Sequence, residues 1–185
     1  MNAGEGNLLL KLARESIAES FGGPKVVKPP KSGFLDQPGA VFVTLRDPHG
    51  ELRGCIGSIQ AHRRLFDDLT HNAKAAAFDD PRMRPVTPEE LGSLHIEVSV
   101  LSELEPLEVS DEEDALRKMR PGVDGIELSA LGRRAVFIPK MWEQLPEPRE
   151  FLYSLKRKAG LPNQWVQGTR LRRFTAESFG EPEKS

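Results

Sequence analysis

Cysteine is nearly absent from this chain of 185 residues, since Cys55 is the single one. A lone cysteine cannot form an intramolecular disulfide, a CxxC redox pair or a zinc site built from several thiolates. The sequence also lacks any apolar run near the roughly 18 residues that span a membrane, and Met1–Asn7 lacks the basic start and apolar core of a signal peptide. These absences predict a soluble, cytoplasmic protein with no membrane contact, in which any chemistry of Cys55 involves another molecule.

An excess of charge of either sign is absent as well. The chain has 26 Lys and Arg residues against 28 Asp and Glu residues, which gives a net charge of −2. Such a balance argues against a protein whose whole surface binds nucleic acid or membrane. Hydrophobic residues make up 38% of the chain, which suffices for one core of ordinary size. The prediction is one domain over residues 1–185, with room for two lobes.

The hydrophobic pattern switches between the helical period and the strand period along the chain. It predicts helices at Asn7–Phe21, at His62–Phe78, and from a Thr87–Glu90 capping box to about Leu91. It predicts two more helices, one after a Ser110–Glu113 capping box and one at Pro148–Ala159. It predicts strands at Ala40–Arg46, Leu52–Ile59, His95–Leu101, Gly125–Ser129, Arg133–Ile138 and Leu171–Thr175. Two hairpins require antiparallel pairing, and regular βαβ spacing is missing, so the fold class is α+β, an antiparallel sheet with flanking helices.

Three segments lie outside these strong patterns or at their margins. The first helix falls within residues 1–21. The segment Pro24–Pro38 is rich in Pro, Lys and Gly, and this composition predicts a surface connector. The tail Gly180–Ser185 is polar, and we expect it to be frayed.

The segment Leu52–Gly57, with the sequence LRGCIG, is unusual because two glycines interrupt a predicted strand. Glycine weakens a strand unless something needs the space that a side chain would fill. In an extended chain Arg53 and Cys55 share one face, and a guanidinium beside a thiol favours the thiolate. Gly54 and Gly57 would leave that thiol open to a ligand. The pattern predicts a reactive or ligand-contacting cysteine, while a bulge around a buried, inert cysteine explains the same residues.

The LRGCIG run resembles the hallmark of the AMMECR family, whose prokaryotic members are called AmmeMemoRadiSam system protein A. Further matches follow in the family's order, at Val41–Leu45, Asn72–Ala73, Asp80–Arg82, Pro85–Thr87, Glu97–Leu101, Gly122–Ile126 and Lys158–Leu161. Met83 departs from the family's usual Phe, and charged Lys156 or Arg157 replaces a frequent second cysteine. The second departure excludes a mechanism that uses two cysteines.

The resemblance implies a fold and a cellular context but no established reaction. It implies a larger lobe, built from both chain ends around an antiparallel sheet, and a smaller lobe from an internal segment. The family's genes are often grouped or fused with those of a Memo-like protein, itself similar to class III extradiol dioxygenases, and of a radical S-adenosylmethionine enzyme. We therefore expect these two proteins as partners in one pathway.

Other candidate residues have weaker signals. His95 and Glu97 alternate onto one strand face, where they form a candidate acid/base pair or an ordinary solvent-facing pair. Arg82 is a candidate for binding an anionic ligand group, and an ion pair with Asp80 that ties down the loop explains it as well. No HxH or HExxH spacing indicates a metal, and no Walker or Rossmann glycine pattern indicates a nucleotide cofactor. We expect neither a metal nor a cofactor.

Three basic clusters raise nucleic-acid binding as a further alternative. They are Arg133–Arg134, Lys156–Lys158 and Arg170–Arg173. Together they could form a stripe that contacts phosphates. Cations in the last turn of a helix also offset its dipole, and Leu171 and Phe174 interleave the last cluster as core residues would. Nucleic-acid binding is therefore the weaker alternative.

The leading hypothesis is a pocket for a small molecule at the LRGCIG segment. Its candidate catalytic residues are Cys55 and Arg53, and its candidate ligand-binding residues are Leu52, Gly54, Ile56, Gly57 and Arg82. The chief alternative is a non-catalytic adaptor that presents this segment to protein partners, so the pattern leaves open whether the chain is an enzyme. The absent Cβ of Gly57 further predicts a notch beside Cys55.

Overall fold

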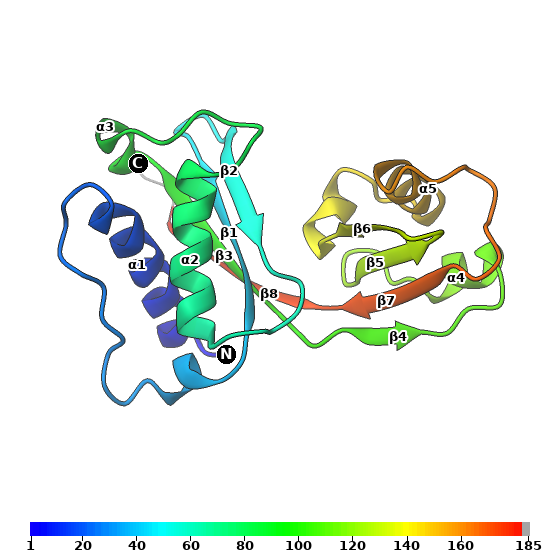
Figure 1. Cartoon of the computed structure of the whole chain (residues 1–185), viewed down its shortest axis with the longest axis horizontal. Helices are drawn as coiled ribbons and strands as arrows, with labels where there is room; N and C mark the ends of the chain where they lie inside the picture. The colour runs from blue at the N-terminus through cyan, green and yellow to red at the C-terminus, as the bar shows by residue number, and fades with distance from the viewer. Residues whose placement is uncertain (183–185) are drawn as a thin grey trace. The chain divides into compact units, whose positions relative to one another are not determined.

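A computed structural model describes residues 1–182 and divides the chain into two compact units (Figure 1). The larger unit comprises Met1–Leu101 together with the segment from Glu177 onward, and the internal unit comprises Ser102–Ala176. Each unit contains a four-stranded antiparallel sheet. This confirms the α+β class and the expected construction of one lobe from both chain ends. No helix within residues 1–182 is long and apolar enough to cross a membrane.

The larger unit has one sheet with the strand order β2-β1-β3-β8. Its elements in chain order are α1 (Ala3–Glu19), η1 (Gly33–Asp36), β1 (Ala40–Arg46), β2 (Leu52–Gly57), α2 (Leu65–Phe78), α3 (Pro88–Leu91), β3 (His95–Leu101) and β8 (Ala176–Gly180). Strand β2, which carries the LRGCIG segment, therefore lies at an edge of the sheet. Helix α2 packs on β1 and β2, and α1 packs on α2 and β3.

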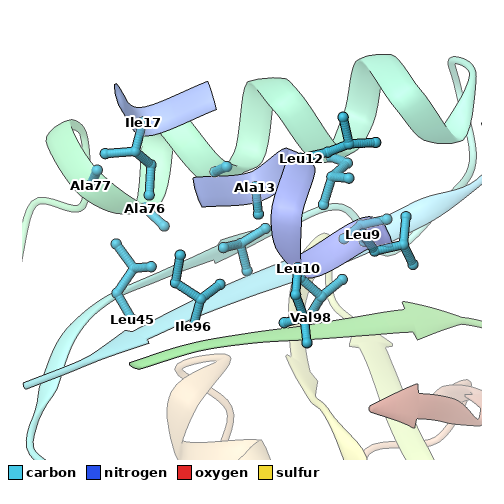
Figure 2. Packing of buried hydrophobic residues seen from close by; sticks show 14 of the residues in the cluster. Leu9, Leu10, Leu12, Ala13, Ile17, Leu45, Ala76, Ala77, Ile96 and Val98 are labelled. Carbon is cyan, nitrogen blue, oxygen red and sulfur yellow. The ribbon is translucent and has the colours of Figure 1, made fainter. Parts of the chain in front are cut away.

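Alternation along the strands separates the two faces of this sheet. Leu45, Ile96 and Val98 are fully buried and meet apolar residues of both helices (Figure 2). The residues that alternate with them form the other face, which we call the polar face. It comprises Phe42, Thr44, Cys55, Gly57, His95, Glu97 and Ser99. Because α1 and α2 pack on the apolar side, Cys55 lies on the side of the sheet that these two helices do not cover.

The internal unit has its own sheet, with the order β4-β7-β5-β6. Its elements are β4 (Glu105–Leu107), α4 (Glu112–Lys118), β5 (Gly125–Ala130), β6 (Arg133–Phe137), η2 (Pro139–Glu143), α5 (Pro148–Lys158) and β7 (Arg170–Phe174). A separate core fills this unit. The ring of Trp142 stacks on Phe151 of α5, with the centroids 3.8 Å apart.

The start of α4 differs from the sequence prediction. The expected capping box of Ser110 and Glu113 is wrong, because Asp111 is the N-cap and its side chain accepts from the N–H of Asp114. Asp114 in turn accepts from the N–H of Ser110. The N-cap is thus a carboxylate one residue after the predicted hydroxyl, and the two aspartates accept from one N–H of the first turn and one N–H that precedes the helix.

Several other elements differ from their predicted bounds. Helix α1 starts at Ala3 behind the cap Asn2, and β2 ends at Gly57. The expected connector buries Leu35 completely. Glu181, expected in a frayed tail, bonds the N–H of Ile96 and pairs with Arg14, while residues 183–185 of that tail lie outside the described residues.

Candidate functional site

Cys55 lies in the middle of β2 and is partly exposed on the polar face. It pairs with Thr44 of β1, and its Sγ is 3.3 Å from the Thr44 Oγ1. On the other side of Thr44 the register places Glu97 of β3. Cys55, Thr44 and Glu97 therefore form a row across three strands. Neighbouring strands are about 4.8 Å apart, so the thiol and the Glu97 backbone are separated by roughly 10 Å.

The main chain of Cys55 is held from outside the sheet. Its N–H donates to Asp80 Oδ2 at 3.0 Å, and its carbonyl accepts from Arg82 Nη2 at 3.4 Å. In an antiparallel ladder both groups of one residue point to the same side, so those of Cys55 point away from β1. Asp80 and Arg82 thus supply the donor and acceptor that a further strand would supply, and they close the sheet edge at this residue.

Asp80 and Arg82 also form an ion pair, with Arg82 Nη2 2.8 Å from Asp80 Oδ2. The Asp80 side chain is almost fully buried, whereas the Arg82 side chain is exposed. The hydrogen bonds from Arg82, aided by the Cys55 N–H, outweigh the effect of burial and hold the pKa of Asp80 well below its usual range. The same bond raises the pKa of Arg82. Arg82 therefore fixes the loop through Asp80 and still reaches the Cys55 carbonyl.

Arg53 is turned towards α3 and is bound there. Its Nη2 lies 3.0 Å from Glu90 Oε2, and its Nη1 donates to the carbonyl of Arg84 at 3.2 Å. Burial by itself raises the pKa of Glu90, but the bonds from Arg53, the Thr87 N–H and Arg84 lower it to about 2. The guanidinium that the sequence placed beside the thiol is thus neutralised by a carboxylate.

One nitrogen of the Arg53 guanidinium has no hydrogen-bond partner. The Arg53 side chain is only 10% exposed, and its Nε is buried. Within residues 1–182 it is the sole buried side-chain nitrogen or oxygen atom without a partner. Buried polar groups are normally satisfied, so this N–H is an exception that calls for an acceptor.

The two glycines beside Cys55 have different functions in the fold. A Cβ on Gly54 would lie 1.9 Å from the carbonyl oxygen of Ala76, so this glycine lets β2 approach α2. A Cβ on Gly57 would lie 2.2 Å from the ring of Phe42. The predicted notch at Gly57 is therefore wrong, because the Phe42 ring occupies that space and forms part of the polar face near Cys55.

Comparison with known proteins identifies the fold and its relatives. Residues 10–179 match the family model described as AMMECR1. The chain belongs to the AMMECR1 family. A protein of Methanothermobacter thermautotrophicus is 40% identical over 182 residues, which cover 96% of this chain and 94% of that protein. Protein MJ0810 of Methanocaldococcus jannaschii is 34% identical, with coverage of 97% and 91%.

A solved structure agrees with this assignment. The crystal structure of the uncharacterised protein PH0010 from Pyrococcus horikoshii superposes with a TM-score of 0.88 at 35% identity. The superposition covers 98% of this chain and 93% of that chain. The AMMECR1 fold therefore extends over nearly all of both chains.

In this AMMECR1-family chain the two candidate acid/base residues lie on the same face but have different surroundings. Glu97 belongs to the row with Thr44 and Cys55. His95 pairs with Arg46, and its Nε2 contacts the carbonyl of Glu181. The structure thus brings Glu97 towards the thiol, while it places His95 against the end of the chain.

The remaining candidates are also located. Ile56 packs against the core of the larger unit, and Gly54 shares its side of β2, whereas Leu52 pairs with Arg46 beyond the register shift. Residues 1–182 contain no group of three His, Cys, Asp or Glu side chains that could hold a metal ion. In the basic clusters, Arg134 and Arg172 pair with the buried Glu127.

Sequence reasoning missed three residues that contact or flank Arg53 or Cys55. Phe42 and Thr44 lie in a segment that matches the family, but nothing marked them as neighbours of the thiol until the strand register was known. Glu90 forms the capping box with Thr87 that the sequence predicts. Its second function, binding Arg53, had no signal in the sequence.

Proposed function

We propose that this AMMECR1-family chain binds a small molecule on the polar face at Cys55, and that the thiol contacts or reacts with this ligand. The observation that carries the proposal is a partly exposed thiol on a fully anchored residue. Asp80 and Arg82 hold its main chain, and Thr44 holds its sulfur. Cysteines with a purely structural function are mostly buried among apolar groups, whereas binding residues are fixed by supporting hydrogen bonds.

The surroundings suggest a role for each neighbour. The Phe42 ring and the Thr44 hydroxyl flank the thiol and would contact the same ligand. The exposed part of Arg82 is available to an anionic group of that ligand. Gly54 and Ile56 support the strand from the side of α2, and Leu52 is the candidate contact at the start of β2. Glu97 is the nearest carboxylate along the row and is the candidate acid or base.

We further propose that the ligand belongs to a pathway shared with a Memo-like protein and a radical S-adenosylmethionine protein. Membership of the family and the gene grouping that the resemblance implies support this context. The chain would bind a substrate or product of those proteins, with or without chemistry at the thiol.

Protection of Cys55 from alkylation tests the proposal. The purified chain is treated with iodoacetamide without denaturant, and labelling is followed by intact-protein mass spectrometry. We expect complete labelling at Cys55, and slower labelling when the small-molecule fraction of a cell extract is added. Cys55→Ser is the control for the labelled position. Protection by the protein fraction alone would instead support the adaptor, and a thiol that reacts only in denaturant would refute the proposal.

A further inference from the structure

The unpaired Nε–H of Arg53 indicates what chemical group the Cys55 ligand carries. Two of the three guanidinium nitrogens have acceptors, the Glu90 carboxylate and the Arg84 carbonyl. The third is buried with none. A buried donor without an acceptor is unfavourable, so the present position of Arg53 leaves one hydrogen bond to be gained.

Arg53 lies next to the candidate site. It is two residues from Cys55 in β2, and its guanidinium group extends towards α3. An acceptor that reaches Nε is therefore close to the thiol. Thr44 and Phe42 pair with Cys55 and Gly57, which follow Arg53 along β2. An acceptor group at the Arg53 Nε–H would therefore lie at one end of a ligand that also contacts Cys55.

The charges near this position favour an anion. Three arginines, Arg53, Arg82 and Arg84, face two carboxylates, Asp80 and Glu90. Glu90 accepts hydrogen bonds from both Arg53 and Arg84 and from the N–H of Thr87. The chain thus already places one carboxylate on these guanidinium groups, which shows that an anionic oxygen group fits them.

We propose that the ligand of the Cys55 site carries a carboxylate or phosphate group and that Arg53 binds it through Nε–H, with Glu90 as the internal competitor. This inference rests on the proposed function and adds the ligand class. Solvent does not reach Nε in the present structure, so Arg53 must shift to bind the anion. Any shift weakens its bonds with Glu90. Removing the Glu90 charge should therefore tighten anion binding, whereas a purely structural ion pair predicts no gain.

NMR of the arginine Nε–H groups tests this directly. The Arg53 signal is assigned by its loss in Arg53→Lys, and inorganic phosphate is titrated at constant ionic strength, with malonate as the carboxylate probe. We expect a saturable shift of the Arg53 signal for at least one probe. Glu90→Gln should lower the apparent Kd about tenfold, the order expected from removing one nearby charge. Glu113→Gln, an exposed acid of the internal unit paired with Arg149, is the matched control and should leave the Kd unchanged.

Three outcomes would overturn the inference. The first is an Arg53 signal that does not move with either probe. The second is a shift that all exposed arginines share and that salt abolishes, which means an adventitious ion only. The third is an unchanged or weaker Kd in a folded Glu90→Gln variant. If that variant does not fold, Arg84→Met, which removes the other guanidinium on Glu90, is compared through the same Arg53 signal and should retain its shift. Protection of Cys55 from alkylation is measured separately. If Cys55 is protected but the Arg53 signal does not shift, the anionic ligand group is refuted and the proposed function is not.

Discussion

Replacing Gly54 with alanine should damage the fold far more than the same change at Gly57, although both lie in one strand. Neither glycine has a positive φ, so backbone conformation does not separate them. The difference lies in what the new methyl group meets. At Gly54 it would lie 1.9 Å from the carbonyl oxygen of Ala76 in α2, and at Gly57 it would lie 2.2 Å from the Phe42 ring.

A helix carbonyl cannot move without the helix, whereas a partly exposed ring can rotate. We therefore expect Gly54→Ala to cost about 3 kcal/mol, the upper end for overpacking, and Gly57→Ala about 1–2 kcal/mol. For a chain of this size about 3 kcal/mol lowers Tm by roughly 6–12 °C. Urea and thermal unfolding monitored by circular dichroism measure both values.

A double-mutant cycle separates the two causes. Phe42→Ala removes the ring, so Gly57→Ala should cost at least about 1 kcal/mol less in that background. The same Phe42→Ala change should not rescue Gly54→Ala, since its obstacle is main chain. A Gly54→Ala protein with unchanged stability, or additive effects of Phe42→Ala and Gly57→Ala, would refute this reasoning.

Three more perturbations follow from the contacts. The pKa of Glu90 is about 2 in the folded chain, against an ordinary value of 4.5. The ionised Glu90 therefore stabilises the fold fully above pH 4.5, and this contribution is lost as the pH falls through 2. Glu90→Gln should lower the free energy of unfolding in urea by about 1–3 kcal/mol at pH 7. The difference in this free energy between the variant and the unmodified chain should become smaller below pH 4.5. Asp80→Asn should cost about 1–3 kcal/mol, because it removes the charge that pairs with the exposed Arg82 and weakens the bond to Cys55, and it should also change the alkylation rate of Cys55. Asp111→Ala should cost about 1 kcal/mol, and Ser110→Ala should cost clearly less, in the same unfolding assay.

The sequence predicted the elements of the fold well because most depend on local patterns. Strand β3 has the predicted bounds, His95–Leu101, since every second residue is apolar, and Ile96 and Val98 are fully buried. The short helix after Thr87 has the predicted capping box. Strand β8 was missed, because Ala176–Gly180 lacks an alternating pattern and gains its pairing from β3, which is far away along the chain.

The residues that neighbour Cys55 could not be predicted from local sequence patterns, because they depend on the strand register. An irregularity between Leu45 and Arg46 shifts the β1–β2 register by one residue. Counting back from the turn without this shift would place Cys55 opposite the core residue Val43 instead of Thr44. A one-residue slip turns every side chain to the other face, so the row with Glu97 could not be derived from the sequence. The partnership of Arg53 with Glu90 likewise depends on tertiary contacts between β2 and α3.

A crystal structure of the chain grown with the small-molecule fraction that protects Cys55 tests the central claim most directly. The account predicts new density within hydrogen-bond distance of Cys55 Sγ, in contact with Thr44 or Phe42, and a main chain at Cys55 still bonded to Asp80 and Arg82. Density elsewhere in the chain, with the surroundings of Cys55 unchanged, would contradict a ligand site at this thiol.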